Sequence, residues 1–196
     1  MPDPPDPLEP YWAALGKFLH RYAQAETTVF NILRVVAGLT HHKATALFSG
    51  TRMSDTISFI RRIHEADGQP LSPWLEKALP KLSQLTTARN EILHQGFSLN
   101  GDKIIVTNRQ RTMPRATTER QYTVEDLIDM EADTCVAHAC LNMHWLESRF
   151  PRSRKAMHQR EKEIATTAWR YKSPQPAPRR RKTPKAARKS KGPPQS

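Results

Sequence analysis

The chain has 196 residues, of which 37% are hydrophobic, and its formal net charge is +12. These values suit one hydrophobic core with additional segments, so we expect a single domain with tails. The lack of any apolar run of about 18 residues excludes a membrane-spanning protein, and the N-terminus shows no secretion pattern. The two cysteines, Cys135 and Cys140, are too few for a disulfide framework or a zinc site. We therefore expect a cytoplasmic protein with no metal or other cofactor.

Composition divides the chain into four parts. The proline-rich residues 1–9 are expected to be disordered, and residues 10–150 are predicted to form an all-α antiparallel helical bundle. Residues 151–171 should continue as a basic helical extension. Residues 172–196 contain nine lysines and arginines, no acid and no large apolar side chain, so they should form a disordered basic tail.

The first helix is predicted from about Leu8 to Leu39 and carries a continuous apolar stripe that includes Tyr22, with Glu26 close to the centre of that stripe. A short helix should follow over residues 43–48. Ser54 is a suitable cap for a third helix, which should close at residues 67–68.

A further long helix should begin at residues 72–73 and end near Gly96, with Pro80 kinking or restarting it. Its apolar stripe consists of Leu75, Ala78, Leu79, Leu82, Leu85, Ile92 and Leu93. Arg89 lies near the middle of this stripe, and because burying an isolated charge costs many kcal/mol, a partner is expected. Glu26 is the best candidate, either in a structural salt bridge or in a pair that orients Arg89 toward a phosphate.

The most informative stretch is the motif Arg89-Asn90-x-x-x-His94, near the end of this helix. At about 100° per residue, Asn90 and His94 lie one turn apart on the same face, with Arg89 beside them. The motif combines a strong phosphate-binding cation with an imidazole that exchanges protons near neutral pH. Metal-free cleavage of RNA requires groups of these kinds.

Helical periodicity disappears between Phe97 and Gln121. A turn is indicated at residues 100–101, and residues 103–107 could form one strand of a small hairpin whose second strand returns at 121–122. Four arginines in this segment are candidates for gripping a nucleic-acid backbone: Arg109, Arg111, Arg115 and Arg120.

Thr123 should cap the last helix of the bundle. The predicted apolar face of this helix consists of Ile128, Ala132, Cys135, Ala139, Met143, Leu146 and Phe150. Cys135 is interpreted as a core residue rather than a reactive thiol. Cys140 and His144 lie one turn apart on a mostly solvated face, and two such side chains do not make a metal site.

The basic tail has two interpretations, a solubilising appendage or a segment that binds RNA or DNA without reading its sequence, and we favour the second. Its candidate nucleic-acid-binding residues are Arg179, Arg180, Arg181, Lys182, Lys185, Arg188, Lys189 and Lys191. In the preceding extension, Trp169 and Tyr171 could stack on bases, but an equally good interpretation is that they anchor the helix end by packing.

The motif Arg89-Asn90-x-x-x-His94 followed by Gly96, on a long helix of a small bundle, resembles the HEPN superfamily (higher eukaryotes and prokaryotes nucleotide-binding), whose ribonuclease members carry this signature. The resemblance covers about residues 10–150. It implies a homodimer formed through the motif helices. It also implies metal-independent cleavage, in which a ribose 2′-hydroxyl attacks the neighbouring phosphate and leaves a cyclic phosphate. His94 would move the proton, Arg89 would stabilise charge on the phosphate, and Asn90 would orient the histidine or the substrate.

The candidate catalytic residues are thus Arg89, Asn90 and His94, with Glu26 orienting the arginine. The family makes a toxin-like or defence role plausible, with a neutralising antitoxin or regulator as a further partner. Other members of the family do not cleave RNA. The competing interpretation is therefore a dimeric binding module that holds nucleic acid or a partner protein, in which Arg89 and His94 are only structural.

Overall fold

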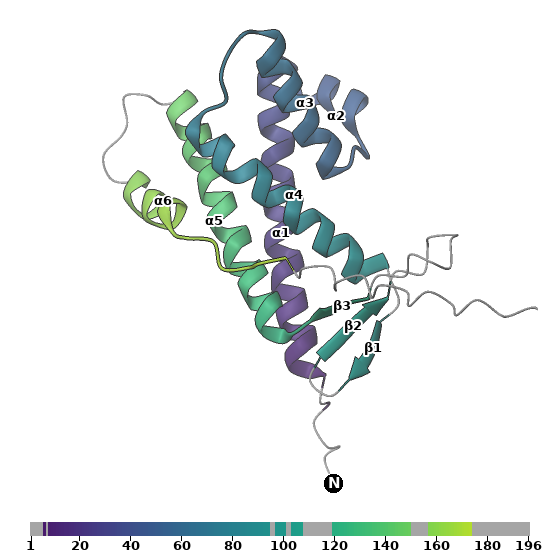
Figure 1. Ribbon diagram of the computed structural model, residues 1–196. Helices are drawn as coiled ribbons and strands as arrows, with labels where there is room; N and C mark the ends of the chain where they lie inside the picture. Colours follow the sequence, from purple (N-terminus) through teal and green to yellow (C-terminus); the bar gives the residue numbers. More distant parts are fainter. Residues whose placement is uncertain are drawn as a thin grey trace, which may run out of the picture.

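The computed structural model describes residues 6, 8–94, 97–100, 103–107, 119–149 and 157–173. Its helices are α1 (Glu9–Val36), α2 (His41–Phe48), α3 (Met53–Ala66), α4 (Pro73–His94), α5 (Val124–Arg149) and α6 (Met157–Thr166). Its strands are β1 (Phe97–Asn100), β2 (Lys103–Thr107) and β3 (Glu119–Tyr122). The predicted all-α bundle is confirmed, with a small sheet beside it (Figure 1). Most of the proline-rich start and of the basic tail lies outside the described residues.

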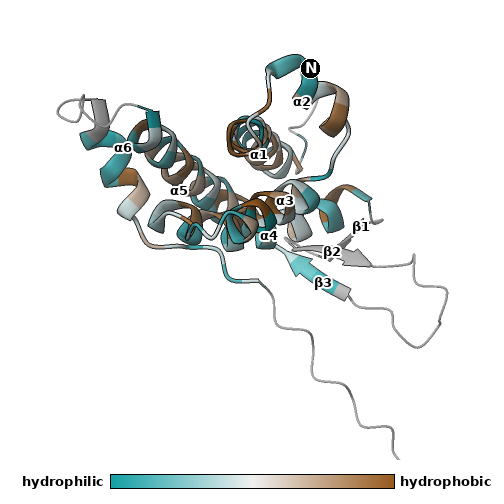
Figure 2. Cartoon of the chain, turned by 90° about the horizontal axis from the view of Figure 1, so that it is seen from above, coloured by the Kyte–Doolittle hydropathy of each residue, from teal (hydrophilic) through white to brown (hydrophobic). Residues whose placement is uncertain are grey.

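Helix α5 is the centre of the bundle. It packs against α1, α4 and α6, while α3 contacts α1 and α4 (Figure 1). Hydrophobic residues of α1, α4 and α5 gather where these helices meet (Figure 2). Phe18, Leu82 and Leu141 are among the largest side chains that this packing buries completely. The core therefore lies between three long helices.

The apolar face predicted for α5 is correct at Ala139 and Met143, which are buried, but wrong at Ile128 and Cys135. Ile128, which was placed in that face, is 49% exposed, and Cys135 is only half-buried, whereas Cys140 is buried. The residues that α5 does bury are Leu127, Met130, Asp133, Thr134, Val136, Ala137, Ala139, Cys140, Leu141 and Met143. Because α5 packs against three helices, it buries side chains around most of its circumference, and a single stripe does not describe it. Phe150 lies outside the described residues.

Local capping explains where several helices begin and end. At α5 the N–H of Asp126 donates to Thr123 Oγ1 at 3.1 Å, and the N–H of Thr123 donates to Asp126 Oδ2 at 2.9 Å, which confirms the predicted cap. The predicted cap at Ser54 is wrong, because α3 begins one residue before it. Gly68, with a φ of 62°, ends α3 as predicted. Pro80 lies inside α4, which continues past it without a restart.

The sheet has the order β1-β2-β3, and both strand pairs are antiparallel. The predicted hairpin is confirmed in β2 and β3, where Ile104 pairs with Tyr122. Strand β1 was not predicted, because four residues are too few to show the alternation of apolar and polar side chains that marks a strand. Tyr122 of β3 is fully buried in the hydrophobic core and so packs the sheet against the bundle.

A buried ion pair joins α4 to α5. Lys81 Nζ lies 2.7 Å from Asp133 Oδ2, and the two side chains are 6% and 0% exposed. The sequence predicted a buried pair on α4 but assigned it to Arg89 and Glu26, which is wrong: among the described residues no ion pair joins those two. A lysine can occupy a core position because its aliphatic stem packs among apolar side chains while its ammonium reaches a partner.

Residues 167–173, which we call the strap, follow α6 and cross α5 toward α4 and β3 (Figure 1). The backbone N–H groups of Arg170 and Tyr171 donate to the two carboxylate oxygens of Asp133 at 2.7 and 2.9 Å. Tyr171 is 3% exposed and Trp169 packs against the core. The interpretation of these two aromatic residues as anchors is therefore confirmed.

Replacement of Asp133 by alanine should destabilise the fold by about 3–5 kcal/mol, because the change strands a buried ammonium and two strap N–H groups. Urea denaturation would measure the loss. Glu131→Ala is a matched control on the same helix, since Glu131 pairs with the exposed Arg21 at 3.3 Å and such pairs contribute less than about 1 kcal/mol. Equal losses of stability in the two variants would show that the buried pair of Lys81 and Asp133 contributes no more than the exposed pair of Arg21 and Glu131.

Acid should weaken the fold through His144. Burial lowers the pKa of His144, the neighbouring His64 lowers it further, and Glu147 opposes the shift. The unfolded chain therefore binds this proton more readily than the folded chain, so stability falls as the pH drops below the unfolded pKa of about 6.5. Urea midpoints measured between pH 8 and pH 5 should decline, and His144→Gln should reduce that decline. An unchanged pH dependence in the variant would rule His144 out as a contributor.

Candidate active site

The motif residues line a cavity of about 660 Å³ between α1, α4 and the start of α3. Its lining consists of Tyr22, Glu26, Arg52, Met53, Thr86, Thr87, Arg89, Asn90, Glu91 and His94. The structure thus brings the four predicted catalytic residues to one cavity, although they come from two helices far apart in the sequence.

Arg89 is supported by an aromatic ring. Its guanidinium carbon lies 5.8 Å from the centroid of the Tyr22 ring, and one terminal nitrogen donates to Asn90 Oδ1 at 2.9 Å. The Nε of Arg89 is buried and has no hydrogen-bond partner within the part of the chain that the structure describes. The arginine therefore keeps a donor that none of the described residues satisfies.

Glu26 is exposed, although it was predicted to be the buried partner of Arg89. Helical periodicity placed Glu26 on the correct side of α1, since it lies one turn after the buried Tyr22. At this turn, however, α1 borders the cavity rather than a packed neighbour. Leu93, expected in the core, is 39% exposed, so the buried stripe of α4 ends at Ile92.

Tyr22 forms a fixed part of the cavity wall. Its hydroxyl lies 2.7 Å from Thr86 Oγ1, and Thr86 donates its own proton to the Leu82 carbonyl at 2.7 Å, so Tyr22 is the donor in the first bond. Burial is the main cause that raises the pKa of Tyr22 to about 12, and Glu26 raises it further while Arg89 opposes it. Tyr22 is therefore neutral at ordinary pH and cannot accept a proton from a substrate.

The third residue of the motif, Glu91, ties α4 to the sheet. Its Oε2 accepts a hydrogen bond from the Tyr122 hydroxyl at 2.7 Å and pairs with an Arg120 nitrogen at 3.1 Å. Arg120, one of the four arginines singled out in the sequence, therefore lies directly behind the cavity wall. Because both contacts use its carboxylate, Glu91 is a structural anchor at the edge of the site.

Several predicted site residues lie outside the described part of the chain. They are Arg109, Arg111, Arg115, Arg179, Arg180, Arg181, Lys182, Lys185, Arg188, Lys189 and Lys191. Gly96, which should end the motif helix, is also outside it. His94 is the last residue of α4, and both His94 and Asn90 are exposed at the cavity.

Sequence reasoning missed the other six residues that line the cavity, among them Tyr22, Thr86 and Arg52. Tyr22 was included in the apolar stripe of the first helix and interpreted only as core. Arg52 is exposed and directly precedes α3, so nothing in the local pattern connected it with a motif on α4. Tyr22 lies one turn from Glu26 on the same helix face, and that spacing could have drawn attention to it.

Comparison with known proteins found no match among protein-family models, curated proteins or solved structures. Within the described ranges, no three histidine, cysteine, aspartate or glutamate side chains are arranged to hold a metal ion. None of the described helices has the length and apolar character needed to cross a membrane.

Replacement of Tyr22 by phenylalanine should lower the free energy of unfolding by about 1 kcal/mol, because one buried hydrogen bond is lost while the ring under Arg89 remains. Tyr22→Leu should cost more, since it also removes the ring. Urea denaturation of both variants is the measurement. A phenylalanine variant as stable as the wild type would show that the hydroxyl bond contributes nothing.

Proposed function

We propose that this chain is a metal-independent endoribonuclease of the HEPN type. One observation supports the proposal above all: Arg89, Asn90 and His94 line the same cavity as Glu26. Phosphodiester cleavage needs a cation that binds the phosphate and groups that transfer protons. The cavity contains both kinds of side chain.

In the proposed reaction, a ribose 2′-oxygen attacks the adjacent phosphorus. The new bond closes a 2′,3′-cyclic phosphate, and the bond from phosphorus to the 5′-oxygen breaks, which leaves a 5′-hydroxyl end. Arg89 binds the non-bridging oxygens and stabilises the charge that develops on them. Asn90 accepts a hydrogen bond from Arg89 and so orients the guanidinium, and Arg52 supplies a second cation at the same cavity.

Proton transfer is assigned to His94 and Glu26. The 2′-hydroxyl must lose a proton and the departing 5′-oxygen must gain one. Of the titratable side chains that line the cavity, Tyr22 has a raised pKa and Glu91 is engaged by Arg120 and Tyr122. His94 and Glu26 are both exposed at the cavity. We assign His94 the principal role, with Glu26 as the second group.

The active form is proposed to be a homodimer in the cytoplasm, with RNA as its substrate. Leu93 is the apolar side chain that such a dimer would bury at the motif, because it is 39% exposed and directly precedes His94 in α4. Burying this side chain would bring two copies of the motif helix together. A toxin-like or defence role, with a neutralising antitoxin or regulator, follows from the same family resemblance.

Replacement of His94 by alanine should reduce RNA cleavage by at least about 100-fold, because it removes the principal proton-transferring group. The assay is incubation of a single-stranded RNA with purified protein in excess EDTA, followed by analysis of the ends. Wild-type protein should leave cyclic phosphate and 5′-hydroxyl ends. His42→Ala is the matched control, because His42 is an exposed histidine on α2 that does not line the cavity.

Thermal unfolding and sedimentation of each variant would separate loss of chemistry from loss of fold or dimer. Intact RNA with a folded, dimeric wild-type protein would contradict the ribonuclease proposal and favour a binding module. Equal activity in the His94 variant and the wild type would remove His94 from the mechanism even if RNA were cut.

A further inference from the structure

Cations reach the cavity from two different elements. Arg89 comes from the C-terminal half of α4, whereas Arg52 directly precedes α3. The cavity volume of about 660 Å³ lies within the range of about 300–1,000 Å³ that is typical of pockets for drug-sized ligands, and one phosphate group fills only a small part of such a space. The cavity therefore has room for more of an RNA strand than the phosphate assigned to Arg89.

The backbone of Arg52 is fixed, but its side chain is not engaged. The Arg52 carbonyl accepts the N–H groups of Asp55 and Thr56, both at 3.0 Å, and the Thr56 hydroxyl at 3.1 Å. The side chain is exposed, and no hydrogen bond or ion pair among the described residues includes it. Its guanidinium therefore holds no described element in place and can offer its donors to a ligand.

Arg89, in contrast, lies among the groups assigned to the reaction. It shares α4 with Asn90 and His94, donates to Asn90 Oδ1 at 2.9 Å and has its guanidinium carbon 5.8 Å from the centroid of the Tyr22 ring. Arg89 is half-buried, whereas Arg52 is exposed. Arg89 is therefore the deeper of the two cations, and Arg52 lies nearer to the solvent.

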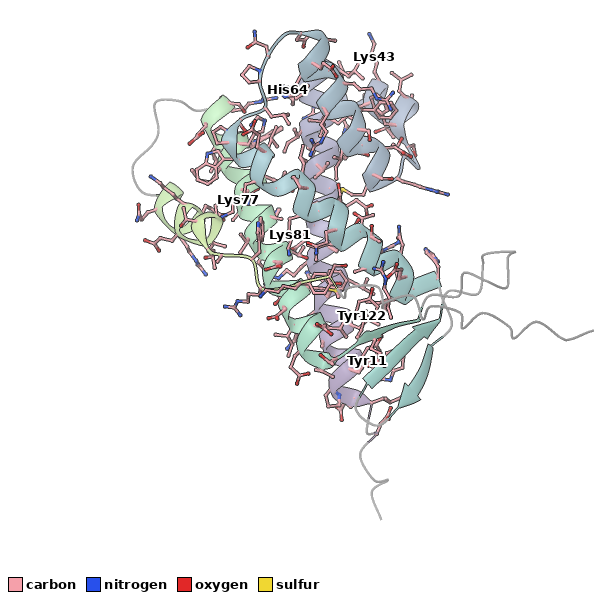
Figure 3. The ribbon with its side chains drawn as sticks, in the orientation of Figure 1. Tyr11, Lys43, His64, Lys77, Lys81 and Tyr122 are labelled. Carbon is pink, nitrogen blue, oxygen red and sulfur yellow. The ribbon has the colours of Figure 1, made fainter. Side chains whose placement is uncertain are left out.

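The two arginines also have separate supports. On the side of the cavity that α4 forms, Glu91 accepts a hydrogen bond from the Tyr122 hydroxyl at 2.7 Å, which ties this end of α4 to the sheet. Figure 3 shows Tyr122 on β3, near the C-terminal end of α4. The position of Arg52 is set instead by α3, which packs against α1 and α4. A ligand that spans the cavity can therefore meet each arginine at a different group.

We propose that Arg52 binds the phosphate next to the one that is cut, so that the cavity selects RNA with two consecutive phosphates. This inference rests on the proposed function, because it takes the phosphate at Arg89 as the reacting one. A strand with its reacting phosphate at Arg89 passes the exposed Arg52 as it leaves the cavity, and the guanidinium forms charge-assisted hydrogen bonds with the neighbouring phosphate. Arg52 is thus a specificity-determining residue that recognises the strand by its phosphate and not by its base.

The test compares cleavage of an RNA dinucleotide that has one internal phosphate with the same dinucleotide carrying an additional phosphate at its 5′ or its 3′ end. The wild type should cut at least one phosphorylated form with a kcat/KM about tenfold higher, because one charge-assisted contact is added. Arg52→Gln should remove this preference and leave cleavage of the plain dinucleotide unchanged. Arg61→Gln is the matched control and should keep the preference, because Arg61 is an exposed arginine of α3 that does not line the cavity.

A wild type without the preference, or an Arg52→Gln variant that keeps it, would overturn the inference. An equal loss on all the substrates in Arg52→Gln would also overturn it, because Arg52 would then act at the reacting phosphate. The same holds for an equal loss of preference in both variants, since net charge alone would explain it. Binding of the dinucleotides with a 2′-O-methyl group in place of the attacking hydroxyl is the independent readout. If the wild type cuts no RNA but still binds a phosphorylated form more tightly through Arg52, the proposed function fails while the phosphate subsite stands.

Discussion

The structure depends on the ion pair between Lys81 and Asp133, which meets at the junction of α4, α5 and the strap. Two unlike charges in a core are tolerated only when their remaining hydrogen-bonding capacity is satisfied. Here both carboxylate oxygens accept strap N–H groups, and the ammonium donates to a strap carbonyl. An apolar pair of the same volume could fill the space, but it could not hold the strap in one position. The pair therefore determines where the strap lies.

The candidate site is built on the same helix, farther toward its C-terminus. Three kinds of support meet there: the aromatic ring of Tyr22 on α1, the amide of Asn90 on α4, and the contacts of Glu91 with the sheet. Two of these supports involve neighbouring elements, α1 and the sheet, so the position of the motif reflects how the bundle packs. This explains why residues distant in sequence, such as Arg52, reach the cavity.

Elements governed by local interactions could be predicted from the sequence. The long helices, the cap at Thr123 and the hairpin of β2 and β3 follow from short-range capping, periodicity and turn preferences. The motif and Glu26 could also be assigned to one side of their helices. Which charge is buried could not be predicted. Periodicity placed Glu26 in an apolar stripe and left Lys81 out of one, whereas burial depends on which neighbouring element covers each residue. The face of α5 was predicted only in part for the same reason, since three neighbouring helices bury side chains around most of it.

The aromatic support of Arg89 has a consequence for how the cavity would accept an anion under the proposed function. A carboxylate bound to the guanidinium would compete with an incoming phosphate for the same donors, and that contact would have to break first. The face of a tyrosine ring attracts the cation without occupying its N–H groups. Under the proposed function, no carboxylate would have to leave Arg89 before a phosphate binds, because no ion pair to Arg89 is found among the described residues.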